Sequence, residues 1–533
     1  MSDSGRILAP APEGGLGRGW RRKPCLRRTQ TVIHSSFLAR LSVQRAPPKL
    51  GDRLNDRSPM PESPSLPPWA RVVLVALALF AIVRGVALVR HDPLLALANS
   101  YDEIRYSSCL TIAPWRPGVR TDLANPPAPY SRFAFLPPPR PSCTLSSDLL
   151  FTAPIAWTWR ISEAMGGRTI HSIRRLAEWR LPVWFGVAAW ATRFFLRERR
   201  GDLALAHLAG FALVAMDPAN TLYLATFYGE AAAVFGLYVT LVALVAALVR
   251  PTRSALAMTA IGAMILALSK YQHLVLPIVL GIAVWVGAGR AGRRVALVLL
   301  VAGTIGAGAQ IVNGLQWTEM ARDIAWINRA DYALDVLLAE TSDRARVVEA
   351  LAINDECLDY IGKSVYVMPG RVDQTCKTVD AWRNNTLWWL LVSDPPALGR
   401  ALLHIPRDLL PWQPRYLGAV EGGNNEHQPW WMPSLDLLFG DRIAFAWALL
   451  LAPWLIATAC LKRGTPPIAR AFALACATGM VAVLVVALFG DGDVEFAKHA
   501  HLAVNFALAS LCLPVAALCR RLLVRDSLAE RRA

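Results

Sequence analysis

The chain has 533 residues, of which 54% are hydrophobic and 18% are charged, and its formal net charge is +17. Because soluble domains carry about 25% charged residues, this composition excludes an ordinary cytosolic enzyme, a disordered protein and a collagen-like fibre. The excess of Lys and Arg is concentrated in residues 1–59 and in short clusters between apolar runs, without a nucleic-acid-binding motif, so we expect a membrane protein with no nucleic acid partner.

Residues 1–59 are rich in Arg, Pro, Gly and Ser and contain no apolar run long enough for a signal peptide. Two interpretations stay open for this segment. It is either a disordered basic leader or the product of an over-called gene start, because Met60 lies directly before the first apolar run. We assign no function to it.

After residue 60, apolar runs of roughly 16–22 residues recur, which is about what a helix needs to cross a hydrocarbon core of ~30 Å. The sequence therefore predicts an all-α polytopic membrane protein with about 10 transmembrane helices. The run 149–161 is shorter and contains Pro and Trp, which fits an interfacial or re-entrant helix better. The predicted spans are 72–90, 181–196, 203–219, 231–249, 254–268, 274–288, 295–312, 443–461, 470–489 and 500–519.

The positive charges between these runs predict their orientation, because Lys and Arg gather in short cytoplasmic loops. With a cytoplasmic amino terminus, the outer turns 217–230, 269–273 and 490–499 carry only Lys270 and Lys498. The short inner loops carry Arg193, Arg197, Arg199, Arg200, Arg250, Arg253, Arg290, Arg293, Arg294, Lys462, Arg463 and Arg470, and the tail adds Arg520, Arg521, Arg525, Arg531 and Arg532.

Both termini are therefore expected in the cytoplasm, and the orientation defines the predicted parts of the chain. These are a membrane domain at 60–312 with a first outer loop at 91–180, an outer segment at 313–442, a second membrane domain at 443–520 and a cytoplasmic tail at 521–533.

The cysteines fit this sidedness. Cys109 and Cys143 share the first outer loop, and Cys357 and Cys376 share the outer segment. An oxidising exterior permits one disulfide in each, although spacing alone does not fix the pairing.

Most of the unusual polar residues fall on the outer side, in turns that are separate in the sequence. Ionisable groups at a membrane are costly and often mark a substrate or ion path, and two Lys–His pairs would suit an anionic phosphate group. We expect one outer cavity to collect Asp102, Glu103, Glu230, Lys270, Gln272, His273, Lys498 and His499.

Structural alternatives stay open for these and nearby residues. Asp102 and Glu103 could be solvated loop acids, and Lys270 could extend along the membrane interface. Asp217 precedes Pro218 and could simply end a helix. Trp residues late in the outer segment are most often interfacial anchors, with stacking on a sugar ring as the alternative.

Four short motifs carry a family resemblance: Asn99-Ser100-Tyr101-Asp102, Thr226-Phe227-Tyr228-Gly229-Glu230, Ser269-Lys270-Tyr271-Gln272-His273, and Gly490-Asp491-Gly492 followed by Lys498-His499. With the order of spans and loops, the chain resembles the integral-membrane glycosyltransferases of the GT-C fold over about residues 70–520. More narrowly, it resembles the bacterial glycan-biosynthesis hexosyltransferase family (WsfD-like).

The resemblance implies transfer of a sugar from a polyprenyl-phosphate donor to a glycan, lipid or protein acceptor on the outer face of the bacterial inner (cytoplasmic) membrane. By position, Asp102 takes the role of the general base in the first outer loop, with Glu103 as the alternative. Donor phosphate or substrate binding falls to Arg105, Glu230, Lys270, Gln272, His273, Lys498 and His499.

The same resemblance leaves a divalent metal open, because some GT-C enzymes use one. Asp102 and Glu103 are adjacent, however, and not separated as in a DxD motif, which weakens a metal-binding interpretation. No cofactor is therefore assigned.

Two other functions fit parts of the pattern. An O-antigen polymerase or ligase also handles lipid-linked glycans outside the membrane, but such proteins rely on arginine-rich outer sites, whereas the outer turns here carry acids and lysines. A transporter is expected to show inverted repeats and broken helices at mid-membrane, and the sequence shows no such repeat. The sequence favours the transferase.

Overall fold

The computed structural model describes residues 66–95, 100–117, 130–136, 143–314, 319–414, 417–421, 433–440, 442–492 and 495–530. All of them belong to one compact unit, Ser63–Ala533. The expected leader at 1–59 lies outside the described residues.

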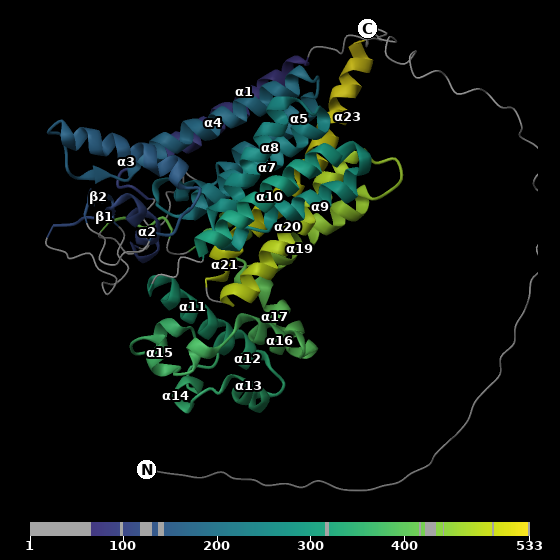
Figure 1. The fold of residues 1–533 in the computed structure, drawn as a ribbon. Coiled ribbons are helices and arrows are strands. Elements are labelled where there is room, and N and C mark those ends of the chain that lie inside the picture. Colours follow the sequence, from purple (N-terminus) through teal and green to yellow (C-terminus); the bar gives the residue numbers. More distant parts are fainter. Residues whose placement is uncertain are drawn as a thin grey trace, which may run out of the picture. The chain divides into compact units, whose positions relative to one another are not determined.

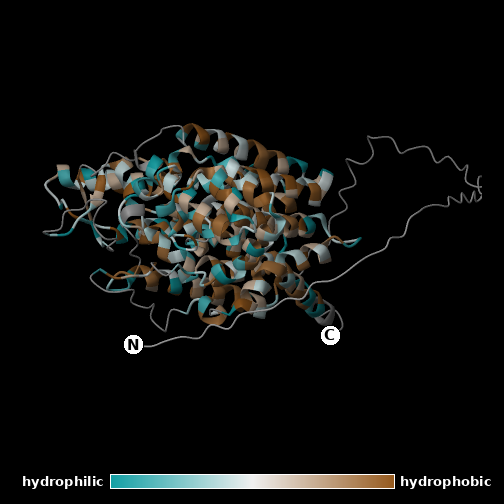
Figure 2. Ribbon diagram, turned by 90° about the horizontal axis from the view of Figure 1, so that it is seen from below, coloured by the Kyte–Doolittle hydropathy of each residue, from teal (hydrophilic) through white to brown (hydrophobic). Residues whose placement is uncertain are grey.

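Helices dominate this unit (Figure 1). Hydrophobic residues are frequent along them, with hydrophilic residues interspersed (Figure 2). Among the described residues, six helical segments qualify as membrane spans by length and composition: Pro68–Arg90, Gly229–Val249, Tyr271–Gly314, Ile443–Cys460, Pro467–Gly490 and His501–Asp526. A seventh arises if Gly201–Ala215 and Pro218–Ala225, which meet at 66°, form one span. The structure therefore supports an all-α membrane protein, with fewer qualifying helices than the ten that the sequence predicts.

The difference has physical reasons in individual helices. Helix α4 (Arg174–Arg197) begins with a charged stretch that lowers its mean hydropathy, and α8 (Arg253–Ser269) is only 17 residues long. Helices α9 (Leu276–Ala288) and α10 (Arg293–Gly314) fall within a single qualifying segment, although the turn Gly289–Gly292 lets them pack against each other.

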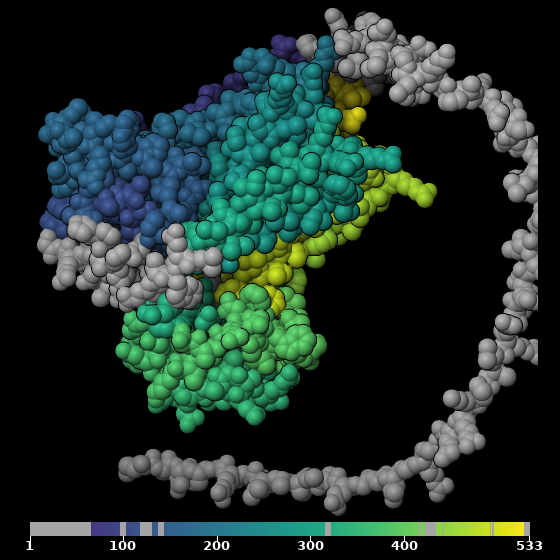
Figure 3. Space-filling view, viewed as in Figure 1, coloured from purple at the N-terminus to yellow at the C-terminus, as the bar shows by residue number. Residues whose placement is uncertain are grey.

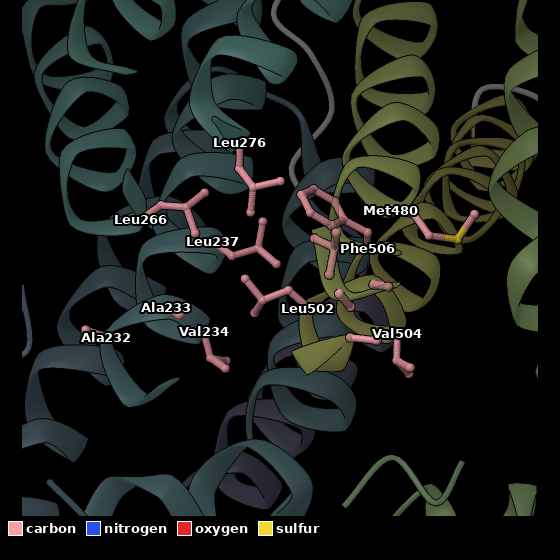
Figure 4. Packing of buried hydrophobic residues seen from close by; sticks show 14 of the residues in the cluster. Ala232, Ala233, Val234, Leu237, Leu266, Leu276, Met480, Leu502, Val504 and Phe506 are labelled. Carbon is pink, nitrogen blue, oxygen red and sulfur yellow. The ribbon is translucent and has the colours of Figure 1, made fainter. Parts of the chain in front are cut away.

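The helices of the bundle surround α7 (Gly229–Val249), most of whose residues are buried on every side. Buried side chains of other helices lie around Leu237 of α7 in Figure 4, among them Leu266, Leu276 and Phe506. The remaining bundle helices are α1 (Pro68–Arg90), α5 (Gly201–Gly210) with the π-helical η3 (Phe211–Ala215), α6 (Pro218–Thr221) with η4 (Leu222–Ala225), α19 (Ile443–Cys460), α20 (Pro467–Asp491), α21 (Phe496–His499), α22 (His501–Ser510) and α23 (Cys512–Glu530).

The first predicted outer loop folds into two short helices and a small sheet. The helices are α2 (Ser100–Ser107) and α3 (Leu149–Ala164), and α3 contains the run expected to be interfacial or re-entrant. The antiparallel sheet has the order β1 (Ile112–Pro114), β2 (Arg132–Phe135) and β3 (His171–Ser172), with Ala113 opposite Ala134 and Phe133 opposite His171. It is an exception to the all-α prediction.

The predicted outer segment forms a cluster of short helices that is separate from the bundle in Figures 1 and 3 and touches the ends of α19 and α20. The Trp388 indole donates to the carbonyl of Phe489 at 2.7 Å, which ties the cluster to α20. Its elements are α11 (Glu319–Asp331), η7 (Tyr332–Leu337), α12 (Leu338–Glu340), α13 (Arg344–Leu351), α14 (Asp355–Leu358), α15 (Val372–Thr375), α16 (Asn384–Val392) and α17 (Pro395–Asp408), followed by α18 (Asp436–Phe439).

Candidate functional site

A buried ion pair joins the start of α7 to the end of α8. The ammonium of Lys270 donates to Oε1 of Glu230 at 2.6 Å, and the two side chains are 10% and 5% exposed. Gly229 permits this approach, because a Cβ there would lie 2.7 Å from the carbonyl oxygen of Ser269. Burial lowers the pKa of Lys270, but Glu230 and Tyr106 raise it and the net shift is upward, so the ammonium stays charged.

The turn after Lys270 is connected to the turn before α22 through Gln272. Its amide Nε2 lies 3.2 Å from Nε2 of His273, and its Oε1 accepts from Nδ1 of His499 at 3.2 Å. His273 is also held by Ser269, whose hydroxyl lies 3.0 Å from Nδ1. Two of the predicted histidines are therefore linked by one glutamine.

Lys498 joins the same cluster from α21. It is 5% exposed, donates to Oε2 of Glu495 at 2.8 Å, and lies 5.6 Å from the centre of the Tyr228 ring. Its charge acts on Lys270, as does that of Arg105 from α2. Three cations from three separate segments thus act within one region. Lys270 is paired with Glu230 and Lys498 with Glu495, so the region holds charges of both signs.

The two candidate bases, Glu103 and Asp102, differ in what the structure describes of their side chains. Glu103 is buried, and its Oε1 accepts from the backbone N–H of Phe227 at 3.1 Å, three residues before Glu230. This contact fixes α2 against the start of α7. Asp102 belongs to α2 as well, but its side chain lies outside the described residues.

Several structural residues near the site were not predicted. Arg180 is 1% exposed, donates to both oxygens of Asp148 at 2.6–2.7 Å, and donates to the carbonyls of Leu224 and Thr226 at 2.7 Å. It therefore orders the segment that leads to Glu230. The sequence shows Arg180 only as an arginine directly before an apolar run. Such an arginine is equally typical of the end of a loop, so its structural role could not be predicted.

A second unpredicted network lies on α22. Nε2 of His501 is 2.8 Å from Oδ1 of Asn220, whose amide donates to Asn505 at 2.9 Å. The Trp412 ring stacks on the imidazole of His501, with ring centres 5.6 Å apart. His501 and Asn505 are four residues apart and share one helix face, which was the only sequence signal for this contact.

Asp217 has a structural role, but it begins helix α6, whereas the alternative interpretation had it end a helix. Its Oδ1 accepts from the backbone N–H of Ala219 at 2.9 Å, so it caps α6. Arg84 pairs with it at 2.8 Å and Ser434 donates to it at 2.7 Å, which joins α1 and the end of the outer segment to the bend after η3.

The predicted disulfides are both present. Cys109 is bonded to Cys143, and Cys357 to Cys376. Within the described residues, no group of three or more His, Cys, Asp or Glu side chains is arranged to hold a metal ion. We derive no step through a metal.

Comparison of the chain with protein-family models gave no match, and comparison with curated proteins gave none either. The function therefore has to be argued from the residues and their geometry.

Proposed function

We propose that this protein is a membrane glycosyltransferase that moves a sugar from a polyprenyl-phosphate donor to a glycan, lipid or protein acceptor on the outer face of a bacterial inner membrane. The observation that carries the proposal is the buried Lys270–Glu230 pair, whose lysine also feels the charges of Arg105 and Lys498 from segments distant in the sequence. A cationic cluster with its own buried carboxylate suits a phosphate leaving group beside a polar substrate.

The charged residues of this region define the steps of the proposed sugar transfer. The acceptor hydroxyl oxygen attacks the anomeric carbon, the bond from that carbon to the phosphate oxygen breaks, and the hydroxyl proton passes to a carboxylate. A positioned base contributes about 10²–10⁴-fold. Lys270, Lys498 and Arg105 stabilise the negative charge that develops on the departing phosphate. A single displacement inverts the anomeric carbon.

Asp102 is the preferred base because Glu103 has a positioning contact to satisfy. The Glu103 carboxylate accepts from the Phe227 N–H while it is 1% exposed. This buried hydrogen bond holds Glu103 against the segment before α7 and defines a structural task for its carboxylate. We therefore assign Glu103 to positioning and the proton transfer to Asp102.

The proposed topology keeps ten crossings with both termini in the cytoplasm. Six crossings come from the six qualifying segments, and one of these segments counts twice because it contains the packed pair α9 and α10. Three more crossings come from α4, from α8, and from α5–η3 taken together with α6–η4. Under this topology the Glu230–Lys270 pair, His499 and the outer segment share the outer side, where a lipid-linked donor would be presented.

Replacing Asp102 tests the assignment in cells. Asp102→Asn should lower glycan modification by about 10²–10⁴-fold, while the protein is inserted at its normal level. The measurement is the mass of surface glycan or glycolipid in a deletion strain that carries wild-type or variant protein. A mass difference of one sugar identifies transfer, whereas a changed chain-length distribution identifies a polymerase.

Glu103→Gln is the matched control, because glutamine keeps an acceptor for the Phe227 N–H. It should retain most of the activity. If both variants retain full activity, the base is elsewhere.

A further inference from the structure

An open groove of about 1310 Å³ lies at the cytoplasmic end of the proposed topology. Its walls come from α5, α19, α20 and α23, and α5 lies beside α23 (Figure 1). The deeper lining is apolar and includes Leu203, Ile456, Leu513 and Ala517.

On α23 the lining residues follow one stripe of the helix. They are Leu513 and Pro514, Ala516 and Ala517, Arg520 and Arg521, and Val524 and Arg525, so they recur every three to four residues. Along this stripe the chemistry changes from apolar to basic at Arg520. At ~1.5 Å per residue, the apolar part from Leu513 to Ala517 rises ~6 Å and the part from Arg520 to Arg525 rises ~8 Å.

The walls formed by α5 and by the turn between α19 and α20 also become polar at the cytoplasmic end. Arg200 and Asp202 stand at the beginning of α5, where the guanidinium donates to both carboxylate oxygens at 2.8–2.9 Å. Thr465 lies in the turn between α19 and α20. The groove therefore has an apolar interior and a rim of polar and charged residues.

The three arginines of α23 differ from Arg200. Arg520, Arg521 and Arg525 are exposed, and none of them pairs with a carboxylate in the part of the chain that the structure describes. Guanidinium groups match phosphate oxygens in geometry and charge, and basic pockets between membrane helices on the cytoplasmic side suit lipid head groups.

We infer that this groove binds a phospholipid with an anionic head group. The phosphate lies at Arg520, Arg521 and Arg525, and an acyl chain follows Leu513 and Ala517 between α19 and α23. The basic rim suits a phosphate group and the apolar walls suit an acyl chain, whereas a free anion would leave the apolar walls uncovered.

The test compares the full chain with two triple variants in detergent. One is R520Q/R521Q/R525Q, and the matched control is R290Q/R293Q/R294Q, which removes three exposed arginines from another predicted inner loop. Each protein is titrated with phosphatidylglycerol or phosphatidylcholine, and bound lipid is counted by native mass spectrometry. Wild type and control should bind one phosphatidylglycerol with at least tenfold preference over phosphatidylcholine, and the α23 variant should lose that preference.

A second variant tests the apolar half without changing any charge. Ala517→Trp places an indole on the exposed wall of the groove and should displace the lipid while all three arginines stay in place. Equal binding by both triple variants, equal binding of the two lipids by wild type, or undiminished binding by Ala517→Trp would each overturn the proposal.

Discussion

At the residue scale, the Glu230–Lys270 pair combines structural and functional roles that a single substitution cannot separate. Both side chains are nearly buried and lie 2.6 Å apart. Removing one partner leaves the other charge buried and unpaired, which costs about 3–5 kcal/mol, whereas replacing both by neutral side chains is often close to neutral. The pair therefore offers a way to distinguish stability from activity.

We predict that Lys270→Met lowers the free energy of unfolding by about 3–5 kcal/mol, and that the double variant E230Q/K270M recovers most of this loss. Donor turnover should fall by about 10²–10³-fold in both variants, because a charge that stabilises the leaving phosphate is gone in each. Denaturant unfolding in detergent and sugar transfer are measured on the same preparations.

The control is the surface pair of Arg250 and Glu198, whose side chains are 66% and 21% exposed. R250M/E198Q should change the stability by at most about 1 kcal/mol and leave turnover unchanged. Recovery of turnover together with stability in E230Q/K270M would mean that Lys270 serves the fold alone.

The sequence predicted the residues of this cluster better than their contacts. Lys270 and Lys498 stood out because they break the charge bias of the outer turns, and the charge of Lys498 lowers the pKa of Lys270. The pairing of Lys270 with Glu230, and the link from Gln272 to His499, depend on how α7, α8 and α21 pack. The distribution of charges predicts on which side of the membrane a loop lies, but it does not predict which helices pack together. These contacts could therefore not be predicted.

At the element scale, two glycines bring α7 and α8 into direct backbone contact. A Cβ at Gly236 would lie 2.7 Å from the backbone nitrogen of Leu266, and a Cβ at Gly262 would lie 2.7 Å from that of Thr240. Small residues allow such close approach between membrane helices. This contact sets the positions of Glu230 and Lys270 at its end.

Gly236→Ala and Gly262→Ala should each lower the free energy of unfolding by about 1–3 kcal/mol, because the added methyl group meets backbone atoms that cannot rotate away. Gly308→Ala in α10 is the matched control, since a Cβ there meets nothing within 4 Å. It should be neutral or stabilise by up to about 1 kcal/mol. Thermal unfolding in detergent measures all three, and equal stability of Gly236→Ala and Gly308→Ala would contradict the close-packing account.

Elements were predictable where apolar runs were long. All ten runs lie mainly in helices, because a run of that length has few other ways to satisfy its backbone in a membrane. The sheet formed by β1, β2 and β3 was not predictable, since its strands have two to four residues and pair across long gaps in the sequence.

At the scale of the whole molecule, the proposed function requires the candidate site to lie on the outer side of the membrane. Under the proposed topology Gly490 lies outside and Ala291 inside. Both are exposed, and a Cβ at Gly490 meets nothing within 4 Å. In a background without the other free cysteines, Gly490→Cys should react with an impermeant maleimide in intact cells, and Ala291→Cys only after permeabilisation. The reverse pattern would invert the molecule.

The central claim is that the purified protein transfers a sugar from a lipid-phosphate carrier. The direct measurement is release of polyprenyl phosphate from a labelled polyprenyl-phosphate hexose by protein in proteoliposomes, with a glycan acceptor present. Wild type should release carrier in step with acceptor glycosylation, and Asp102→Asn and E230Q/K270M should not. Donor that stays intact with wild type, or carrier released equally by both variants, would contradict the account.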